Sequence, residues 1–97
     1  MPKGYWVVDL EVSDPEGYKD YQAFVRPFLA ANGGRFLVRG GKMEVVEGTV
    51  RPRVVIIEFD SFEEARRVYH SMEYREGRAL RLGRSSGNVA IVEGIEG

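Results

Sequence analysis

An α+β sandwich, in which helices cover one side of a four-stranded sheet, is the fold class that the sequence predicts. Three observations support it. The chain has 97 residues, which suits one small domain over residues 1–97. Four segments have the apolar pattern of strands. Two segments with helical spacing separate them, in the order strand, helix, strand, strand, helix, strand.

The first strand and helix have clear boundaries. Residues 5–12 alternate between a bulky apolar side and a mixed side, as a half-buried strand does. Asp14 and Pro15 then supply an N-cap and a first helical residue. The helix is expected to run to about Asn32, where Gly33 allows a left-handed cap.

The next two strands are expected at residues 35–40 and 53–59. Gly40 and Gly41 between them allow two interpretations. They form either a tight hairpin turn or a bulge in one long bent strand that continues to Glu47. We favour the bulge, because a better turn follows at residues 48–52.

The second helix begins with a capping box, in which Ser61 caps the helix and Glu64 bonds back to it. Helical turns are expected to continue towards Leu82. Residues 87–93 form the last strand.

This order predicts a ferredoxin-like βαββαβ sandwich, because right-handed crossovers bring both helices onto one face of the sheet. We expect the first and third strands to be parallel neighbours. The bulkier side chains are assigned to the helix-covered face: Trp6, Val8, Leu10, Phe36, Val38, Val55, Ile57 and Phe59. The uncovered face then carries Val7, Leu37, Val54 and Ile56 together with Asp9, Arg39 and Glu58.

An uncovered sheet of this size measures roughly 400 Å², near the largest apolar patch that a monomer tolerates. We therefore expect a homodimer through the open sheet face, since a two-fold axis covers both copies with one self-complementary surface.

Three charged residues on the uncovered face form the candidate site. In the expected register Lys42 faces Glu58, and a bulge brings Arg39 close; parallel strands bring Asp9 to the same end. Arg39 and Asp9 are thus candidate ligand-binding residues, and Glu58 is a candidate catalytic base. The alternative is a structural ion pair.

His70 is the other candidate catalytic residue, because it is the only histidine and titrates near neutral pH. Alternatively, it only stabilises a helix end. The topology places it at the opposite end from Glu58 within one subunit.

Composition excludes several functions. The chain has no cysteine, and its scattered carboxylates and single histidine give no metal-ligand spacing, so neither metal nor cofactor is expected. The net charge of −1 and the absence of exposed aromatics on residues 53–59 argue against nucleic acid. The arginines from Arg75 to Arg84 are interpreted as a solvated face. No stretch is long enough for a membrane span, and a cytoplasmic protein is expected.

Several segments carry a family resemblance: KGYWVVDLEVSDPEGYKDY, FLVRGG, VVIIEF with FEEA, and YHSMEY. In this order they resemble an uncharacterised bacterial family, domain of unknown function 1330. That family is similar to the dimeric α/β-barrel superfamily, whose ferredoxin-like protomers pair through their sheets. The resemblance implies a dimer with a cavity between its sheets, and it supplies no catalytic residues.

Two functions are compatible with these observations. One is a homodimeric protein that binds a small molecule between its sheets, as a cofactor-independent enzyme that transfers a proton on a small carbonyl or aromatic compound. The other is a non-catalytic dimeric binding or interaction module.

Overall fold

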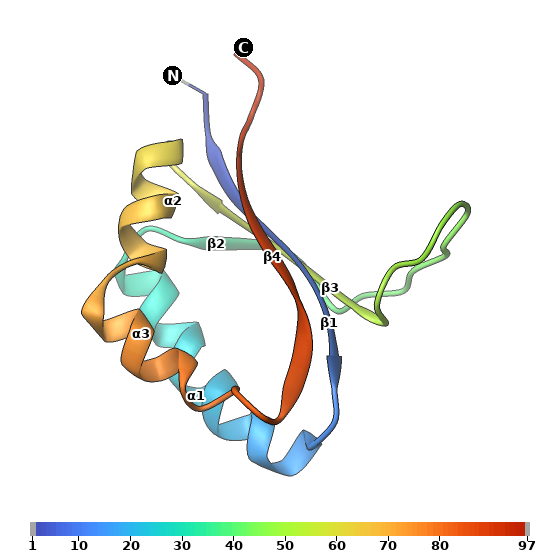
Figure 1. The fold of residues 1–97 in the computed structure, drawn as a ribbon. Helices are drawn as coiled ribbons and strands as arrows, with labels where there is room; N and C mark the ends of the chain where they lie inside the picture. Colours follow the sequence, from blue (N-terminus) through green and yellow to red (C-terminus); the bar gives the residue numbers. More distant parts are fainter. Residues whose placement is uncertain (1, 97) are drawn as a thin grey trace.

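A computed structural model describes residues 2–96 of the chain (Figure 1). Its elements follow the expected order: β1 (Gly4–Val12), α1 (Pro15–Ala31), β2 (Arg35–Arg39), β3 (Arg53–Phe59), α2 (Phe62–Tyr69), α3 (Met72–Arg78) and β4 (Ser85–Glu93). The N-caps are those that the sequence indicates: Asp14 accepts from the Gly17 amide, and Ser61 from the Glu64 amide. The helical segment expected to follow α2 is a separate short helix, capped by Ser71.

The four strands form one sheet in the order β2-β3-β1-β4, and the helices lie on one side of it (Figure 1). The predicted α+β, ferredoxin-like fold is confirmed. The expectation that the first and third strands are parallel was wrong, since β1 and β3 are antiparallel. The reason is topological. The α1 crossover returns the chain so that β2 runs in the direction of β1, and the connection after β2 reverses it.

The core lies between the sheet and the helices. Trp6, Val8 and Leu10 of β1 are buried, as are alternate residues of β3 and the inner side of α1. The Trp6 indole packs against the Phe59, Tyr69 and Tyr74 rings and donates a 2.9 Å hydrogen bond to the Ala65 carbonyl oxygen. Burying one such aromatic side chain contributes about 3 kcal/mol to folding.

Strand β2 departs from the predicted alternation. Phe36 pairs with Ile57 and Val38 pairs with Ile56, so the register shifts at Leu37. One extra residue in a strand reverses the facing of all residues after it. Val38, assigned to the helix-covered face, therefore lies on the uncovered face, and Arg39 lies on the helix-covered face.

Residues 40–52 form neither a tight turn nor a continued strand; they form a long excursion between β2 and β3, hereafter the arm. It projects away from the sheet and the helices (Figure 1). Its base is closed by a 2.8 Å hydrogen bond from the Gly40 amide to the Val54 carbonyl oxygen. The bulge predicted at Gly40-Gly41 lies three residues earlier, at Leu37, and Gly40 itself takes a left-handed conformation with φ of 67°.

The other face of the sheet has no helix on it. Val7, Leu37, Val38 and Val92 are all exposed there. Within residues 2–96, no helix has the length and apolar character needed to cross a bilayer.

Candidate functional site

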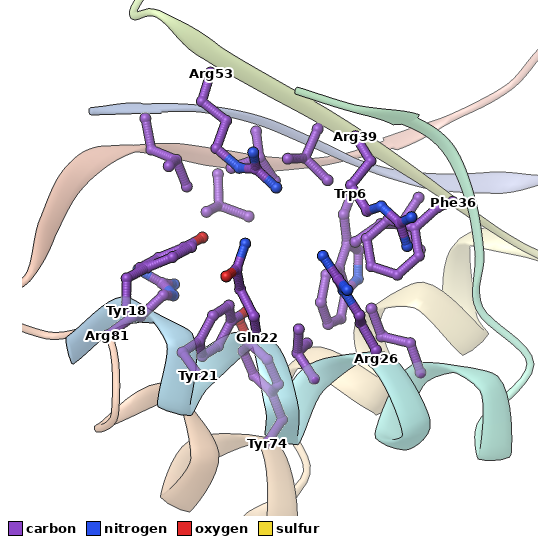
Figure 2. A pocket seen from close by; sticks show the side chains of 17 residues that line it. Trp6, Tyr18, Tyr21, Gln22, Arg26, Phe36, Arg39, Arg53, Tyr74 and Arg81 are labelled. Carbon is purple, nitrogen blue, oxygen red and sulfur yellow. The ribbon is translucent and has the colours of Figure 1, made fainter. Parts of the chain in front are cut away.

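A pocket lies within the protomer, between the sheet and α1, near the end of the sheet where the arm begins (Figure 2). Its free volume is about 40 Å³. One water molecule needs roughly 10–15 Å³ on this measure, so the pocket has room for a few waters or a small ligand. The walls are mostly apolar and include Trp6, Val8, Val25, Phe36, Val55 and Ile57.

The polar side chains of the pocket share one property, which is that they can donate hydrogen bonds. They are Tyr18, Tyr21, Gln22, Arg26, Arg39, Arg53, Tyr74 and Arg81. No aspartate, glutamate or histidine occurs among the described residues that line the pocket. Figure 2 shows these side chains reaching the pocket from α1, from the sheet and, for Tyr74 and Arg81, from α3 and the segment that follows it.

Helix α1 supplies one wall because its residues recur with helical spacing. Tyr18, Gln22 and Arg26 lie four residues apart, so they occupy successive turns on the face that meets the sheet. Tyr21 and Val25 fill the positions between them and are buried. The polar members of this stripe interrupt an otherwise apolar face at the pocket.

The four arginines differ in depth. Arg26 and Arg39 are exposed, whereas Arg53 and Arg81 are partly buried. The Arg39 guanidinium lies 5.2 Å from the Phe36 ring centroid, and that of Arg81 lies 5.6 Å from the Tyr21 centroid. These cation–π contacts orient the guanidinium groups without neutralising them.

None of the four arginines forms an ion pair with a carboxylate of residues 2–96. The Nε atom of Arg53 is buried and has no hydrogen-bond partner within the same residues. A buried polar donor without a partner costs about 1–3 kcal/mol, and a charged donor costs more. The Arg53 guanidinium therefore offers a buried donor that an acceptor on a ligand can pair with.

Burial favours the neutral, protonated form of two tyrosines of the pocket, Tyr18 and Tyr21. Burial raises the pKa of Tyr18, although the positive charge of Arg53 opposes this. Burial also raises the pKa of Tyr21, and its hydroxyl lies 2.7 Å from that of Tyr74. Protonated phenols can donate hydrogen bonds to a negatively charged ligand.

This combination of groups has one clear chemical capacity. Guanidinium groups and phenols stabilise negative charge, and a low-dielectric wall strengthens that effect. A base that could accept a proton is absent from the described lining. The pocket therefore suits an anion with a small apolar body.

The structure locates Arg39 in this pocket, on the helix-covered face (Figure 2). The expectation that it lies on the uncovered face beside Glu58 was wrong, because the bulge at Leu37 reverses its direction. Its predicted role, binding an anion, remains a prediction and now concerns a different cavity.

Asp9 and Glu58 lie on the uncovered face but do not converge. Because β1 and β3 are antiparallel, Asp9 pairs with Val54 near the arm, whereas Glu58 pairs with Tyr5 at the other end of the sheet. The residue opposite Glu58 in β2 is Arg35, so the predicted pairing with Lys42 was also wrong.

Each of these carboxylates has local partners. Asp9 accepts hydrogen bonds from the Arg51 backbone amide at 3.2 Å and from Asn88 at 3.1 Å, and the first of these is the main cause of its lowered pKa. Glu58 accepts hydrogen bonds from Tyr5 and Arg35, both at 3.1 Å.

His70 caps the C-terminal end of α2 and is exposed. Its ring packs edge-on against Tyr69, with 5.4 Å between the ring centroids, and it lines neither the pocket nor the uncovered face. Within residues 2–96, no group of three histidine, aspartate or glutamate side chains is arranged to hold a metal ion.

Sequence reasoning missed Arg26, Arg53 and Arg81. The last belongs to a series interpreted as solvated, yet it is partly buried against Tyr21. A signal for Arg26 existed, since it continues the spacing of Tyr18 and Gln22. Arg53 could have been found by alternation, because it precedes the buried residues Val55 and Ile57 by two and four positions.

These features define the class of protein: a small α+β domain with a ferredoxin-like fold. The chain belongs to the family described as Domain of unknown function (DUF1330), whose family model matches residues 3–95. The predicted resemblance is thereby confirmed. No curated protein matches the sequence.

Several solved structures share the fold. One is the RPA0582 protein of unknown function from Rhodopseudomonas palustris, with a TM-score of 0.75 and 14% identity over 99% of this chain and 85% of that chain. Another is SnoaB, a cofactor-independent oxygenase from Streptomyces nogalater, with a TM-score of 0.71 and 14% identity over 100% of this chain and 97% of that chain. At these identities the likeness shows the fold alone.

Proposed function

We propose that this protein binds a small organic anion in the pocket between the sheet and α1. The observation that carries the proposal is a set of four arginines around an apolar pocket without a lining carboxylate. A carboxylate or a similar anionic group would pair with Arg53 and Arg81, and its apolar part would contact Trp6 and Phe36.

Electrostatics support this assignment. The whole chain has a net charge of −1, so the four positive charges are a local feature of the pocket and not a general property of the surface. The exposed arginines of the pocket, Arg26 and Arg39, attract an anion as it approaches. A hydrogen bond to a charged group contributes about 1.5–3 kcal/mol, which corresponds to at least a tenfold gain in affinity.

The second part of the proposal is a homodimer through the uncovered sheet face. Val7, Leu37, Val38 and Val92 make this face apolar and exposed, and a second copy covers it with the same residues. In such a dimer each copy keeps its own pocket, because the pocket lies on the other side of the sheet.

A cofactor-independent enzyme is the second candidate, and the likeness of fold to SnoaB favours it. In this case the arginines stabilise negative charge that develops on a carbonyl or aromatic substrate. Glu58 and His70 were predicted as bases for proton transfer. Both lie outside the pocket, so this role requires a substrate held on the uncovered face or at the end of α2.

Calorimetry with matched ligands tests the anion proposal. Benzoate and benzamide have nearly the same shape but differ in charge. We expect benzoate to bind with one site per chain and benzamide to bind at least tenfold more weakly. We expect Arg53→Gln to weaken benzoate binding at least tenfold.

The control is Arg67→Gln, because Arg67 lies on α2 and pairs with Glu64 outside the pocket. This variant should bind benzoate like the unaltered protein. Equal binding of benzoate and benzamide, or an equal loss in both variants, would contradict the proposal.

A further inference from the structure

The arm is the largest feature that the proposed ligand site does not explain. Met43, Val45, Val46 and Val50 are all exposed along it, and Val46 has 78% of its surface accessible. Burying side chains of this kind against a partner is favourable, because it removes apolar surface from water. The arm projects into solvent and away from the helices (Figure 1).

The base of the arm is continuous with the uncovered face. Val50 lines a hollow of about 340 Å³ together with Val7, Val54 and Ala90 of the sheet. The Arg51 amide donates to Asp9 on the same face. The base of the arm is therefore continuous with the uncovered face, and a partner that covers this face meets the arm where it joins the sheet.

We infer that the arm seats on a second copy of this chain and that, through its two ends, it links dimerisation to the anion pocket. This inference rests on the proposed dimer and pocket. Area favours a second copy as the occupant. A stable interface buries about 800 Å² on each partner, whereas the sheet face covers roughly 400 Å². The arm borders this face and exposes Met43, Val45, Val46 and Val50, so it is the segment that can add apolar area to such an interface.

Charge is also compatible with self-association. The arm carries Lys42, Glu44, Glu47 and Arg51, so its positive and negative charges cancel. A surface without net charge can meet its own copy without repulsion, and opposite charges can pair across a two-fold axis.

The link to the pocket follows from where the arm is attached. The strand residue before the arm is Arg39, and the strand residue after it is Arg53. Both line the pocket (Figure 2). The Arg53 guanidinium also lies against Gly40, the first residue of the arm, where any larger side chain would collide with it. A partner that holds the arm therefore acts on the segment that joins two of the four arginines.

Such coupling is reciprocal. If dimerisation strengthens anion binding, then an anion strengthens the dimer by the same factor. Two independent measurements, dimer affinity and ligand affinity, should therefore change together when the tip of the arm is altered.

The decisive variant is Val46→Asp, which places a charge at the tip of the arm. Sedimentation equilibrium should show at least a tenfold rise in the dimer dissociation constant. Benzoate should bind at least threefold more weakly at a protein concentration where the unaltered chain is dimeric. Met72→Asp is the matched control: Met72 is 73% exposed, and an acidic residue suits its place at the start of α3.

Val7→Asp on the sheet separates this inference from the proposed dimer. If Val7→Asp dissociates the dimer and Val46→Asp does not, the arm inference is overturned and the sheet dimer stands. If Val46→Asp dissociates the dimer without changing benzoate affinity, the link to the pocket is overturned. If the unaltered chain is monomeric at every concentration, both the proposed sheet dimer and the arm inference are overturned. Val45→Asp replaces Val46→Asp if circular dichroism shows the latter to be misfolded.

Discussion

The two faces of the sheet treat charge in opposite ways. On the uncovered face Asp9 and Glu58 each have partners within hydrogen-bond distance. On the helix-covered face four arginines share a pocket with no acidic residue among the described lining residues. Locally neutralised charge is typical of structural ion pairs, whereas positive charge kept without a counterion is typical of a binding site. The difference favours a binding site on the helix-covered face, which was expected to contain only core residues.

The largest expected effect comes from removing the Arg53 guanidinium, a charge without a carboxylate partner on the helix-covered face. Arg53→Met keeps the aliphatic stem and eliminates a guanidinium whose Nε is buried without a partner. We expect the free energy of unfolding to rise by about 1 kcal/mol, which corresponds to a rise in Tm of roughly 4–8 °C for a domain of this size. Differential scanning calorimetry measures the change.

The same variant should fail to bind benzoate, because a site that sacrifices stability for binding gains stability when binding is lost. A lower Tm would mean that Arg53 supports the fold, and the contrast between the two faces would then disappear.

The opposite change sharpens the comparison. Glu58→Gln removes the negative charge that pairs with Arg35, and it leaves only one oxygen to accept the hydrogen bonds of Arg35 and the Tyr5 hydroxyl on the uncovered face. We expect a loss of stability of about 0.5–1 kcal/mol, since the ion pair is partly exposed, and no change in benzoate affinity. The pKa of Tyr5, which the hydrogen bond to Glu58 raises, should fall towards its ordinary value in a spectrophotometric titration.

This outcome would assign Glu58 a structural role. A loss of ligand binding or turnover in Glu58→Gln, with the fold intact, would instead restore it as the candidate base.

The smallest expected effect concerns Asp9. Its pKa is held below the ordinary value of 3.8, chiefly by the Arg51 backbone amide. A carboxyl with a lowered folded-state pKa contributes stability above its unfolded pKa, and this contribution is lost as pH falls through the folded value. In Asp9→Asn the free energy of unfolding should therefore fall less steeply as the pH drops below about 4. Urea unfolding at a series of pH values measures it, and an unchanged acid limb would show that Asp9 is not coupled to folding.

Much of the fold could be predicted because its signals are local. The caps at Asp14 and Ser61 and the alternation in β1 and β3 depend on neighbouring residues, and the structure has them where the sequence indicates. Strand direction depends on the whole path of the chain, and there the prediction failed. Asp9 and Glu58 were consequently expected together, although they lie at opposite ends of the sheet.

The candidate site was harder to predict, because its position depends on a bulge of one residue. Gly40 and Gly41 were the natural place for it, but the register shifts at Leu37, a residue with no special backbone preference. The position of the bulge depends on pairing between strands, because Phe36 pairs with Ile57 on the helix-covered face and Val38 pairs with Ile56 on the uncovered face. The prediction that Arg39 binds an anion thus survives as a proposal in a cavity that the sequence did not suggest.

The bulge at Leu37 also bears on how relatives should be aligned. Phe36 and Arg39 point to the same side although three positions separate them, because one residue of the strand is left out of the alternation. A relative lacking that extra residue would have the aromatic and the arginine two positions apart in a regular strand, again on the same side. An alignment with a one-residue gap at Leu37 would therefore match the arginine of the relative to Arg39 in the pocket. An ungapped alignment would match it to Val38, which lies on the uncovered face.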